Sequence, residues 1–405
     1  MKAGETTNMP GYDMERCLEC GACLAACPYI RLSRGRARRE MQRLRRGEPS
    51  IVLTRCAGCG TCDAACTHGR RPYSLIRQRW HERYNRRCLP LRARFLLPHS
   101  TPNFRSTLAL SPGETAYVRS LRKVPAGPRV LYSGCNALLL PYQLQSGLWN
   151  GLEVMGALDF CCGEMYYRMG LFDHARQCAL RLKDLFQDSP VREMVFLCSA
   201  CYNMLANVYP RELGVELDFE KTFATEFLNK RLQAGTLKFT RPLRRTVTVH
   251  DSCHAKLMGG ALWDETRDLL KSAGAGIIES RHTRESSLCC GVAAGCSRFS
   301  PVDLAAAGIR RLLEFDRTGA QTATAYCNGC FLTLESVRRA LPTRTPVAPY
   351  WDLLMQAAGE PVPKHVPLRR TRQMLAGVLL RAMPDTLRVF ERHCPCDIQK
   401  LRDIT

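Results

Sequence analysis

The chain has 405 residues, of which 45% are apolar and 24% are charged, which is ordinary for a soluble globular protein of roughly two to four domains. Its formal net charge of +22 suits nucleic acid, an acidic redox partner or anionic lipid headgroups, and no run approaches the roughly 18 consecutive apolar residues of a membrane-spanning helix. The 23 cysteines exceed what core packing needs, and because the N-terminus lacks a signal-peptide pattern we expect a reducing cytoplasm, where clustered cysteines bind metals or carry out redox chemistry.

Composition divides the chain into five expected segments. Residues 1–88 carry two tight groups of cysteines and are expected to form a helical domain. Residues 89–128 are rich in Pro and Arg and are interpreted as a linker. Residues 129–240 and 241–356 alternate strand-like and helix-like patterns, and residues 357–405 form a basic tail with one apolar helical stretch, MLAGVLLRAM.

The first cysteines have the spacing of a protein that holds two four-iron clusters, CxxCxxCxxxCP from Cys17 to Pro28 and CxxCxxCxxxC from Cys56 to Cys66. Three closely spaced thiolates bind one cube, and the fourth cysteine of each motif serves the other cube. The predicted ligand sets are Cys17, Cys20, Cys23 and Cys66 for one cubane [4Fe–4S] cluster and Cys56, Cys59, Cys62 and Cys27 for the other. Zinc is the alternative, but structural zinc usually takes two separated CxxC pairs.

The middle of the chain contains one cysteine pattern twice. Each half has a cysteine after a strand-like run, then a Cys-Cys-Gly triplet, then a Cys-x-x-Cys pair after a second strand-like run. Such self-similarity indicates an internal duplication. The members are Cys135, Cys161, Cys162, Cys198 and Cys201 in the first half and Cys253, Cys289, Cys290, Cys327 and Cys330 in the second.

Alternation of short apolar runs with helical patterns predicts α/β units with a parallel sheet. Strands are expected at Arg129–Tyr132, Met194–Leu197, Thr246–His250 and Thr322–Tyr326. Because ligands gather beyond the carboxyl ends of parallel strands, we expect the five cysteines of each half around one crevice. Gly163 and Gly291 would allow the sharp turn that directs two adjacent cysteines to one site.

Thiol chemistry without metal is the alternative for this second set. A Cys-x-x-Cys pair that opens a helix can have a lowered thiol pKa and exchange disulfides, which would explain the two pairs but not the Cys-Cys-Gly triplets. His250, Asp251 and His254 flank Cys253, and for them we expect a core or capping role rather than hydrogen bonds to cluster sulfurs. Cys178 is expected in the core.

Two ferredoxin motifs followed by two copies of C…CCG…CxxC resemble the family of D-type iron–sulfur subunits of heterodisulfide reductase, over residues 14–356. Its relatives include the iron–sulfur subunits of anaerobic glycerol-3-phosphate dehydrogenase and of glycolate oxidase, and a K-type subunit associated with sulfite reduction. The resemblance implies a mixed α+β and α/β fold, in which an N-terminal helical ferredoxin-like domain with two [4Fe–4S] clusters precedes two duplicated α/β CCG domains. It also implies one or two non-cubane [4Fe–4S] clusters, each held by the five cysteines of one half. The gap from Cys135 to Cys161 is shorter than that from Cys253 to Cys289, which leaves open whether the first half holds a cluster.

The resemblance implies an electron-transfer subunit of a larger oxidoreductase, with Cys253, Cys289, Cys290, Cys327 and Cys330 as its catalytic site. The cubane clusters would pass electrons to the CCG clusters, either to reduce a disulfide or to connect a flavoprotein dehydrogenase with the quinone pool. The expected partners are a flavoprotein, a ferredoxin-like protein or a quinone-reactive membrane subunit, and the expected location is the cytoplasm or the inner face of the membrane. The alternatives are a cluster-free thiol–disulfide oxidoreductase and a nucleic-acid-binding iron–sulfur protein, which the lack of DNA-reading motifs disfavours.

Overall fold

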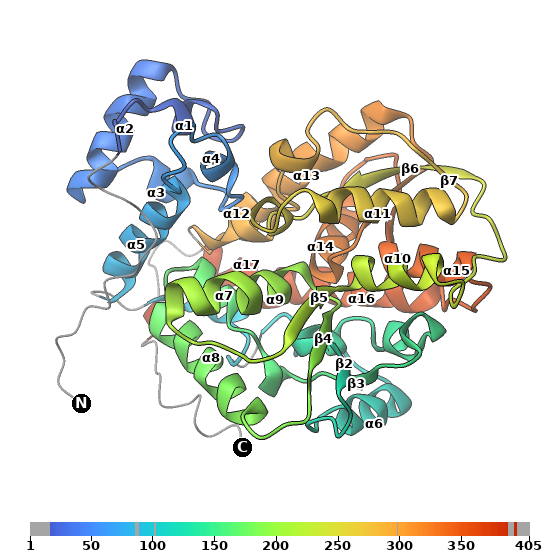
Figure 1. Cartoon of the computed structure of the whole chain (residues 1–405). Coiled ribbons are helices and arrows are strands. Elements are labelled where there is room, and N and C mark those ends of the chain that lie inside the picture. Colours follow the sequence, from blue (N-terminus) through green and yellow to red (C-terminus); the bar gives the residue numbers. More distant parts are fainter. Residues whose placement is uncertain (1–16, 86–88, 101–102, 298, 388–392, 395–405) are drawn as a thin grey trace.

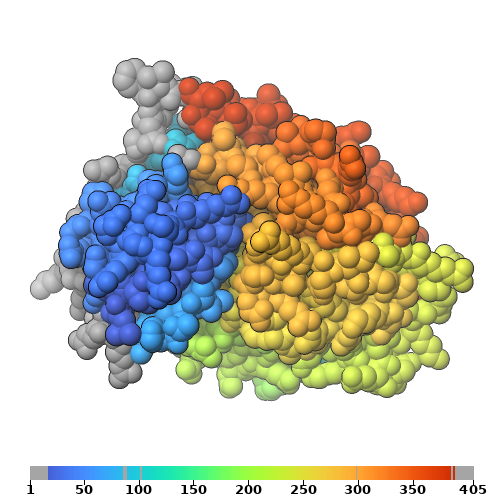
Figure 2. All heavy atoms as spheres, turned by 90° about the horizontal axis from the view of Figure 1, so that it is seen from above, coloured from blue at the N-terminus to red at the C-terminus, as the bar shows by residue number. Residues whose placement is uncertain are grey.

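The structure is a computed structural model that describes residues 17–85, 89–100, 103–297, 299–387 and 393–394. It contains a helical N-terminal region and two parallel four-stranded β-sheets with helices packed around them (Figure 1). The predicted α/β class is therefore confirmed for the middle of the chain. In the space-filling view the N-terminal region lies against residues of the second half (Figure 2). Among the described residues, every helix is too short or too polar to cross a membrane.

The N-terminal region is helical, as predicted, and comprises α1 (Ala22–Ala25), α2 (Arg34–Arg46), α3 (Val52–Arg55), α4 (Thr61–Ala64) and α5 (Pro72–Asn85). Helices α1 and α4 each begin after a glycine with a φ of 71°, Gly21 and Gly60. This left-handed conformation lets each cysteine loop turn into its helix. A small core that includes Leu44 and Trp80 joins α2 and α5 to the cysteine loops.

The first sheet has the strand order β3-β2-β4-β5, with all strands parallel. Its strands are β2 (Arg129–Tyr132), β3 (Glu153–Met155), β4 (Glu193–Phe196) and β5 (Glu220–Phe223). Its helices are α7 (Glu164–Arg168), α8 (Phe172–Phe186), α9 (Ser199–Asn203), the π-helix η6 (Met204–Leu213) and α10 (Ala224–Gln233). The central strands are apolar and buried, as expected for a parallel sheet that helices cover.

The second sheet has the equivalent order, β7-β6-β8-β9, and is also parallel. Its strands are β6 (Arg245–His250), β7 (Ala275–Ile277), β8 (Thr322–Ala325) and β9 (Val347–Pro349). Its helices are α11 (Ala261–Ser272), α12 (Val292–Cys296), α13 (Pro301–Thr318), α14 (Asn328–Ala340) and α15 (Tyr350–Ala357). The four predicted strands are confirmed as the central pair of each sheet, β2 with β4 and β6 with β8.

The connection after the first strand differs between the two halves. Helix α11 lies between β6 and β7, whereas three short 3₁₀ turns lie between β2 and β3. These turns are η2 (Gly134–Leu138), η3 (Pro141–Gln145) and η4 (Gly147–Trp149). The absence of a helix at this point of the described first half accounts for the short gap between Cys135 and Cys161.

The two halves share one hydrophobic core. The rings of Trp149 and Trp351 meet edge to face at 5.4 Å, and those of Phe223 and Tyr326 at 6.2 Å. The buried carboxylate of Asp352 accepts a hydrogen bond of 2.6 Å from Gln143 across the same interface. Contacts of this kind hold the two sheets in one fixed relation.

Residues on both sides of the sheets also pack onto them. Strand β1 (Leu89–Pro90) pairs with β10 (His393–Cys394), and η1 (Leu91–Phe95) lies against η9 (Val378–Ala382) and α17 (Met383–Thr386). Helix α16 (His365–Gly377) packs on α14, and its buried Arg370 forms an ion pair of 2.6 Å with Glu114 of α6 (Pro112–Ser120). The predicted helical stretch MLAGVLLRAM is confirmed as helical, while the five segment boundaries stay predictions.

Gly170 lies where helix α5 approaches the first half. Its φ is 79°, and a Cβ atom there would lie 2.6 Å from the backbone nitrogen of His81 and 2.7 Å from the carbonyl oxygen of Arg77. We expect Gly170→Ala to lower the free energy of unfolding by more than about 2 kcal/mol, because backbone overlap adds to left-handed strain. Gly151→Ala is the control, since Gly151 has a φ of 91° but no atom within 4 Å of the added Cβ. It should lose only about 1 kcal/mol, and equal losses of the two variants in chemical denaturation would show that the close approach of α5 has no energetic weight.

Candidate iron–sulfur centres

The first predicted ligand set surrounds one small cavity in the N-terminal region, lined by Cys17, Cys20, Cys23 and Cys66. Burial, together with the thiols of Cys66, Cys17 and Cys20, raises the pKa of Cys23 to about 12. Backbone N–H groups lie 3.4 Å from the Sγ atoms of Cys17 and Cys66. Thiols that oppose one another's ionisation bind together as thiolates only when a cation such as iron compensates their charge.

The second predicted set also lies together. Burial and the charge of Cys27 raise the pKa of Cys56, and Cys59 acts in the same direction. The N–H groups of Gly58 and Ile30 lie 3.3 and 3.5 Å from the Sγ atoms of Cys56 and Cys27. The fourth cysteine of each motif is thus placed with the first three of the other motif.

The second N-terminal set, not the first, faces the two sheets. The backbone N–H of Cys289 donates a hydrogen bond of 2.6 Å to Tyr29 Oη, and Tyr29 follows Cys27 by two residues. Lys256 donates to Thr61 Oγ1 at 2.8 Å and to the carbonyl oxygen of Ser287 at 2.6 Å. The second set therefore contacts the second half directly.

In both halves, cysteines lie at the carboxyl ends of the central strands, as the α/β pattern predicts. Cys135 follows β2 within η2, and Cys198 follows β4 as the N-cap of α9. Cys253 follows β6, and Cys327 follows β8 as the N-cap of α14. The second halves of the two Cys-x-x-Cys pairs, Cys201 and Cys330, lie in the first turn of those helices.

Nine of the ten cysteines in the two halves form a continuous row of hydrogen-bonded thiols, which we call the thiol row. In spatial order it comprises Cys135, Cys161, Cys162, Cys201, Cys198, Cys327, Cys330, Cys290 and Cys289. The contact between Cys198 and Cys327 joins the two halves. Hydrogen bonds from Cys161 and Cys201 lower the pKa of Cys162 to about 7, so the row favours thiolate at that position.

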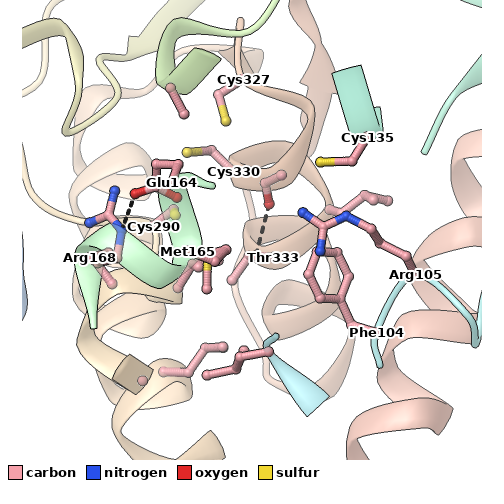
Figure 3. Close-up of a pocket in the computed structure, with 18 of the residues that line it drawn as sticks. Phe104, Arg105, Cys135, Glu164, Met165, Arg168, Cys290, Cys327, Cys330 and Thr333 are labelled. Atoms are coloured by element: carbon pink, nitrogen blue, oxygen red, sulfur yellow. Dashed lines mark hydrogen bonds and ion pairs between the residues drawn. The ribbon is translucent and has the colours of Figure 1, made fainter. Parts of the chain in front are cut away.

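A cavity of about 130 Å³ lies between the halves and opens onto the thiol row (Figure 3). All five cysteines of the first half line it, and so do Cys253, Cys290, Cys327 and Cys330 of the second. Apolar side chains such as Phe104, Met165 and Met374 form much of the remaining wall. The two sets are therefore neighbours around a shared space rather than two separate crevices.

The glycine of each triplet adopts the turn that the sequence predicts. Gly163 has a φ of 73° and Gly291 a φ of 119°, and each precedes a short helix, α7 or α12. A Cβ atom on Gly291 would lie 2.3 Å from the carbonyl oxygen of Leu304. Only glycine combines this backbone with so close an approach, so the predicted turn is confirmed.

Arg168 connects the second half with the N-terminal region. It donates to the carbonyl oxygen of Gly58 at 2.9 Å, and its guanidinium lies 3.4 Å from Cys253 Sγ. Glu164 accepts from Arg168 at 2.5 Å. Although burial alone would raise the pKa of Glu164, the charges of Arg168 and His254 lower it to about 2. The carboxylate is therefore ionised and fixes the guanidinium beside the cysteine.

His250 is buried, as expected, but it also lies next to the thiol row. Its ring nitrogen, Cys290 Sγ and Cys330 Sγ lie within 4.8 Å of one another and could hold a metal ion. Arg311 donates to His250 Nδ1 at 3.2 Å, which fixes the ring. The neighbouring Asp251 instead pairs with Arg267 at 3.0 Å and has the structural role that the sequence predicts.

The donor sets fit iron–sulfur clusters. Soft thiolates in groups of four and five, buried and approached by N–H groups, are the ligands that these clusters use. The cysteines whose side chains the structure describes carry no disulfide bonds, and Cys178 is buried in α8, as predicted. Which cysteine binds which iron stays a prediction, and Cys88 and Cys396 lie outside the described residues.

Sequence reasoning did not find Tyr29, Arg105 or Arg168. Arg105 lies in the segment interpreted as a linker, and Arg168 is one arginine among many. Tyr29 stands close to a predicted ligand, Cys27, and this proximity was the one available signal. Their roles depend on contacts between distant segments, which spacing does not encode.

Comparison with known families gives two matches. The family model for a 4Fe–4S dicluster domain matches residues 9–67, and the model for a cysteine-rich domain, CCG, matches residues 149–206 and 247–335. These matches identify the cofactors as [4Fe–4S] clusters.

Several proteins of known name are similar to the chain. The D-type subunit of the dihydromethanophenazine:CoB--CoM heterodisulfide reductase of Methanosarcina barkeri is 28% identical over 57% of this chain and 59% of its own length. EtfAB:quinone oxidoreductase of Syntrophomonas wolfei is 31% identical over 35% of the chain and 19% of its own length. The C-type subunit of the anaerobic glycerol-3-phosphate dehydrogenase of Escherichia coli is 26% identical over 50% of the chain and 54% of its own length. The match thus spans little more than half of the heterodisulfide reductase and glycerol-3-phosphate dehydrogenase relatives.

We expect Arg168→Gln to lower the free energy of unfolding by about 3–5 kcal/mol, because Glu164 would remain buried without its cation. Arg176→Gln is the control, since Arg176 is exposed on α8 and should change stability by no more than about 0.5 kcal/mol. Urea denaturation under anaerobic conditions measures both variants. A loss at Arg168 no larger than that at Arg176 would show that the network does not hold the site.

Proposed function

Because the chain belongs to the iron–sulfur oxidoreductase family that joins a 4Fe–4S dicluster domain to CCG domains, we propose that it is the electron-transfer subunit of a heterodisulfide reductase-like complex. The observation that carries this proposal is the continuity of buried sulfur. The second N-terminal set contacts the second half, and the thiol row then runs through both halves.

The two N-terminal sets would hold two cubane clusters that act in series. Cys62 of the second set lies close enough to Cys23 of the first for their charges to interact. On the other side, Tyr29 bridges the second set and the backbone of Cys289. Electrons would therefore enter at the first set and pass through the second set to the second half, or follow the reverse path.

The two halves would arise from one duplicated unit, because they share a strand order, a cysteine pattern and a match to the CCG family. We infer that each half holds one non-cubane [4Fe–4S] cluster with its five cysteines. The short first gap does not argue against the first site, because Cys135 still reaches Cys161. His250 would assist the second site, since it lies beside Cys290 and Cys330.

The cysteines of the second half would form the catalytic site, facing the shared cavity. When bound, the clusters supply single-electron transfer. The protein buries their cysteine ligands, places Arg168 beside Cys253 and exposes the thiol row to a molecule in the cavity. Reduction of a disulfide there would take two electrons and two protons and give two thiols.

Other redox subunits are the expected partners. Relatives are named as a subunit of a heterodisulfide reductase, as an EtfAB:quinone oxidoreductase and as a subunit of a dehydrogenase. By analogy, a flavoprotein or a ferredoxin-like protein would exchange electrons at the N-terminal region. In a dehydrogenase-type complex, the same path would connect a flavoprotein with a quinone-reactive membrane subunit.

A cluster-free thiol–disulfide oxidoreductase is the second candidate, because Cys198 and Cys201 contact each other at the start of α9. That protein would be colourless, whereas iron–sulfur clusters give broad visible absorbance.

We expect about sixteen irons per chain after anaerobic purification, from four-iron clusters at all four sites, and two types of low-temperature EPR signal. Cys290→Ala should remove about four irons and weaken the signal of the non-cubane type. Iron analysis and EPR measure both effects.

Cys178→Ala is the matched control, because Cys178 is also buried but belongs to neither ligand set. It should keep the full iron content. About eight irons with ordinary ferredoxin signals alone would rule out the CCG clusters, and a colourless protein would favour the cluster-free candidate.

A further inference from the structure

The shared cavity contains a buried arginine with unused hydrogen-bond donors. Arg105 is only 8% exposed, and its Nε and NH1 atoms have no hydrogen-bond partner among the described residues. A buried donor without a partner costs free energy, more so when it belongs to a charged group. The side chain therefore has the capacity to bind a further acceptor.

The position of Arg105 is fixed by its own loop. Asn103 Oδ1 accepts from the backbone N–H of Arg105 at 2.8 Å, and Asn103 Nδ2 donates to the carbonyl oxygen of Pro98 at 3.0 Å. The guanidinium lies 4.2 Å from the centre of the Phe104 ring. Figure 3 shows it between Cys135 and Thr333, directed into the cavity. Its donors are thus held ready and need little rearrangement to bind an acceptor.

Arg105 differs from the other deeply buried arginine of the cavity. Arg168 is satisfied by Glu164, by the carbonyl oxygen of Gly58 and by Cys253. Arg105 has the thiol of Cys135 as a neighbour but, within the described part of the chain, no carboxylate partner. Charge compensation for the first cysteine set accounts for the contact with Cys135, but leaves Nε and NH1 unused.

We propose that Arg105 binds the anionic group of the small molecule that enters the cavity. That group is a carboxylate, sulfonate or phosphate, each of which accepts hydrogen bonds from a guanidinium. Apolar side chains such as Phe104 and Met165 line the same space, so a short apolar chain would connect the anion with the part that reaches the thiol row. The inference rests on the proposed function and narrows its substrate to an anionic disulfide rather than an uncharged quinone.

Equilibrium binding of suberate to the full chain with its clusters tests the proposal. Suberate is a dicarboxylate as long as a short disulfide dicarboxylate, but it does not react with thiols, and its dimethyl ester has the same chain without charge. We expect suberate to bind at least about tenfold more tightly than the ester, and Arg105→Gln to abolish this preference. Arg105→Lys should retain part of it, since the charge remains but the planar fork is lost.

Arg372→Gln is the matched control, because Arg372 is exposed on α16 and the variant loses the same charge. It should bind suberate as the unaltered chain does. A chain that shows no preference for suberate over the ester, or an Arg105→Gln variant that keeps the preference, would overturn the proposal. If Arg105→Gln lost iron, Arg105→Lys would decide the matter: unchanged suberate binding by that variant would assign Arg105 to the cluster alone.

The two proposals can fail separately. A low iron content in the unaltered chain would contradict the cluster assignment, but the comparison between suberate and its ester would remain valid because protein contacts alone place Arg105. Conversely, a full set of clusters with no preference for suberate would leave the electron path in place and remove the anionic substrate.

Discussion

Buried thiolates that lie side by side repel one another, and the low dielectric of a protein interior increases that cost. In this chain the two N-terminal sets and the thiol row place many cysteine sulfurs under this constraint at once. Arg105 and Arg168 supply positive charge beside Cys135 and Cys253. Two guanidinium groups cannot balance so many thiolates, so the arrangement requires further cations, and iron in clusters meets that need. The folding of the body and the binding of its cofactors are therefore expected to be coupled.

The fold meets this constraint by repeating one solution. Each half brings cysteines to the carboxyl ends of parallel strands, and the two sheets face each other so that Cys198 meets Cys327. The N-terminal region docks with its second cysteine set against the second half, through Tyr29 and Lys256. Sulfur atoms from all three parts of the chain thus lie along one line, and that line ends at a cavity with an unsatisfied cation. The arrangement suits electron transfer from the N-terminal region to a small molecule between the halves.

The sequence allowed the helical N-terminal region and the central strands to be predicted, because cysteine spacing and apolar runs are local signals. The edge strands β3, β5, β7 and β9 were not found, since each has only three or four residues. The pattern also led us to expect one crevice in each half, whereas the cysteines line a shared cavity; the packing of Trp149 on Trp351 that creates this closeness is invisible in the spacing. Arg105 was missed because a Pro- and Arg-rich run suggests a connection rather than a binding site. Local chemistry was readable from the sequence, but the relation between distant segments was not.

Iron-edge anomalous diffraction from crystals grown without oxygen is the most direct test of whether sulfurs from distant segments converge on shared iron. We predict an iron peak at each of the two N-terminal sets and one in each half, with the second N-terminal peak next to Tyr29 and Cys289. Peaks confined to the N-terminal region, with the thiol row joined in disulfides or empty of metal, would contradict this prediction.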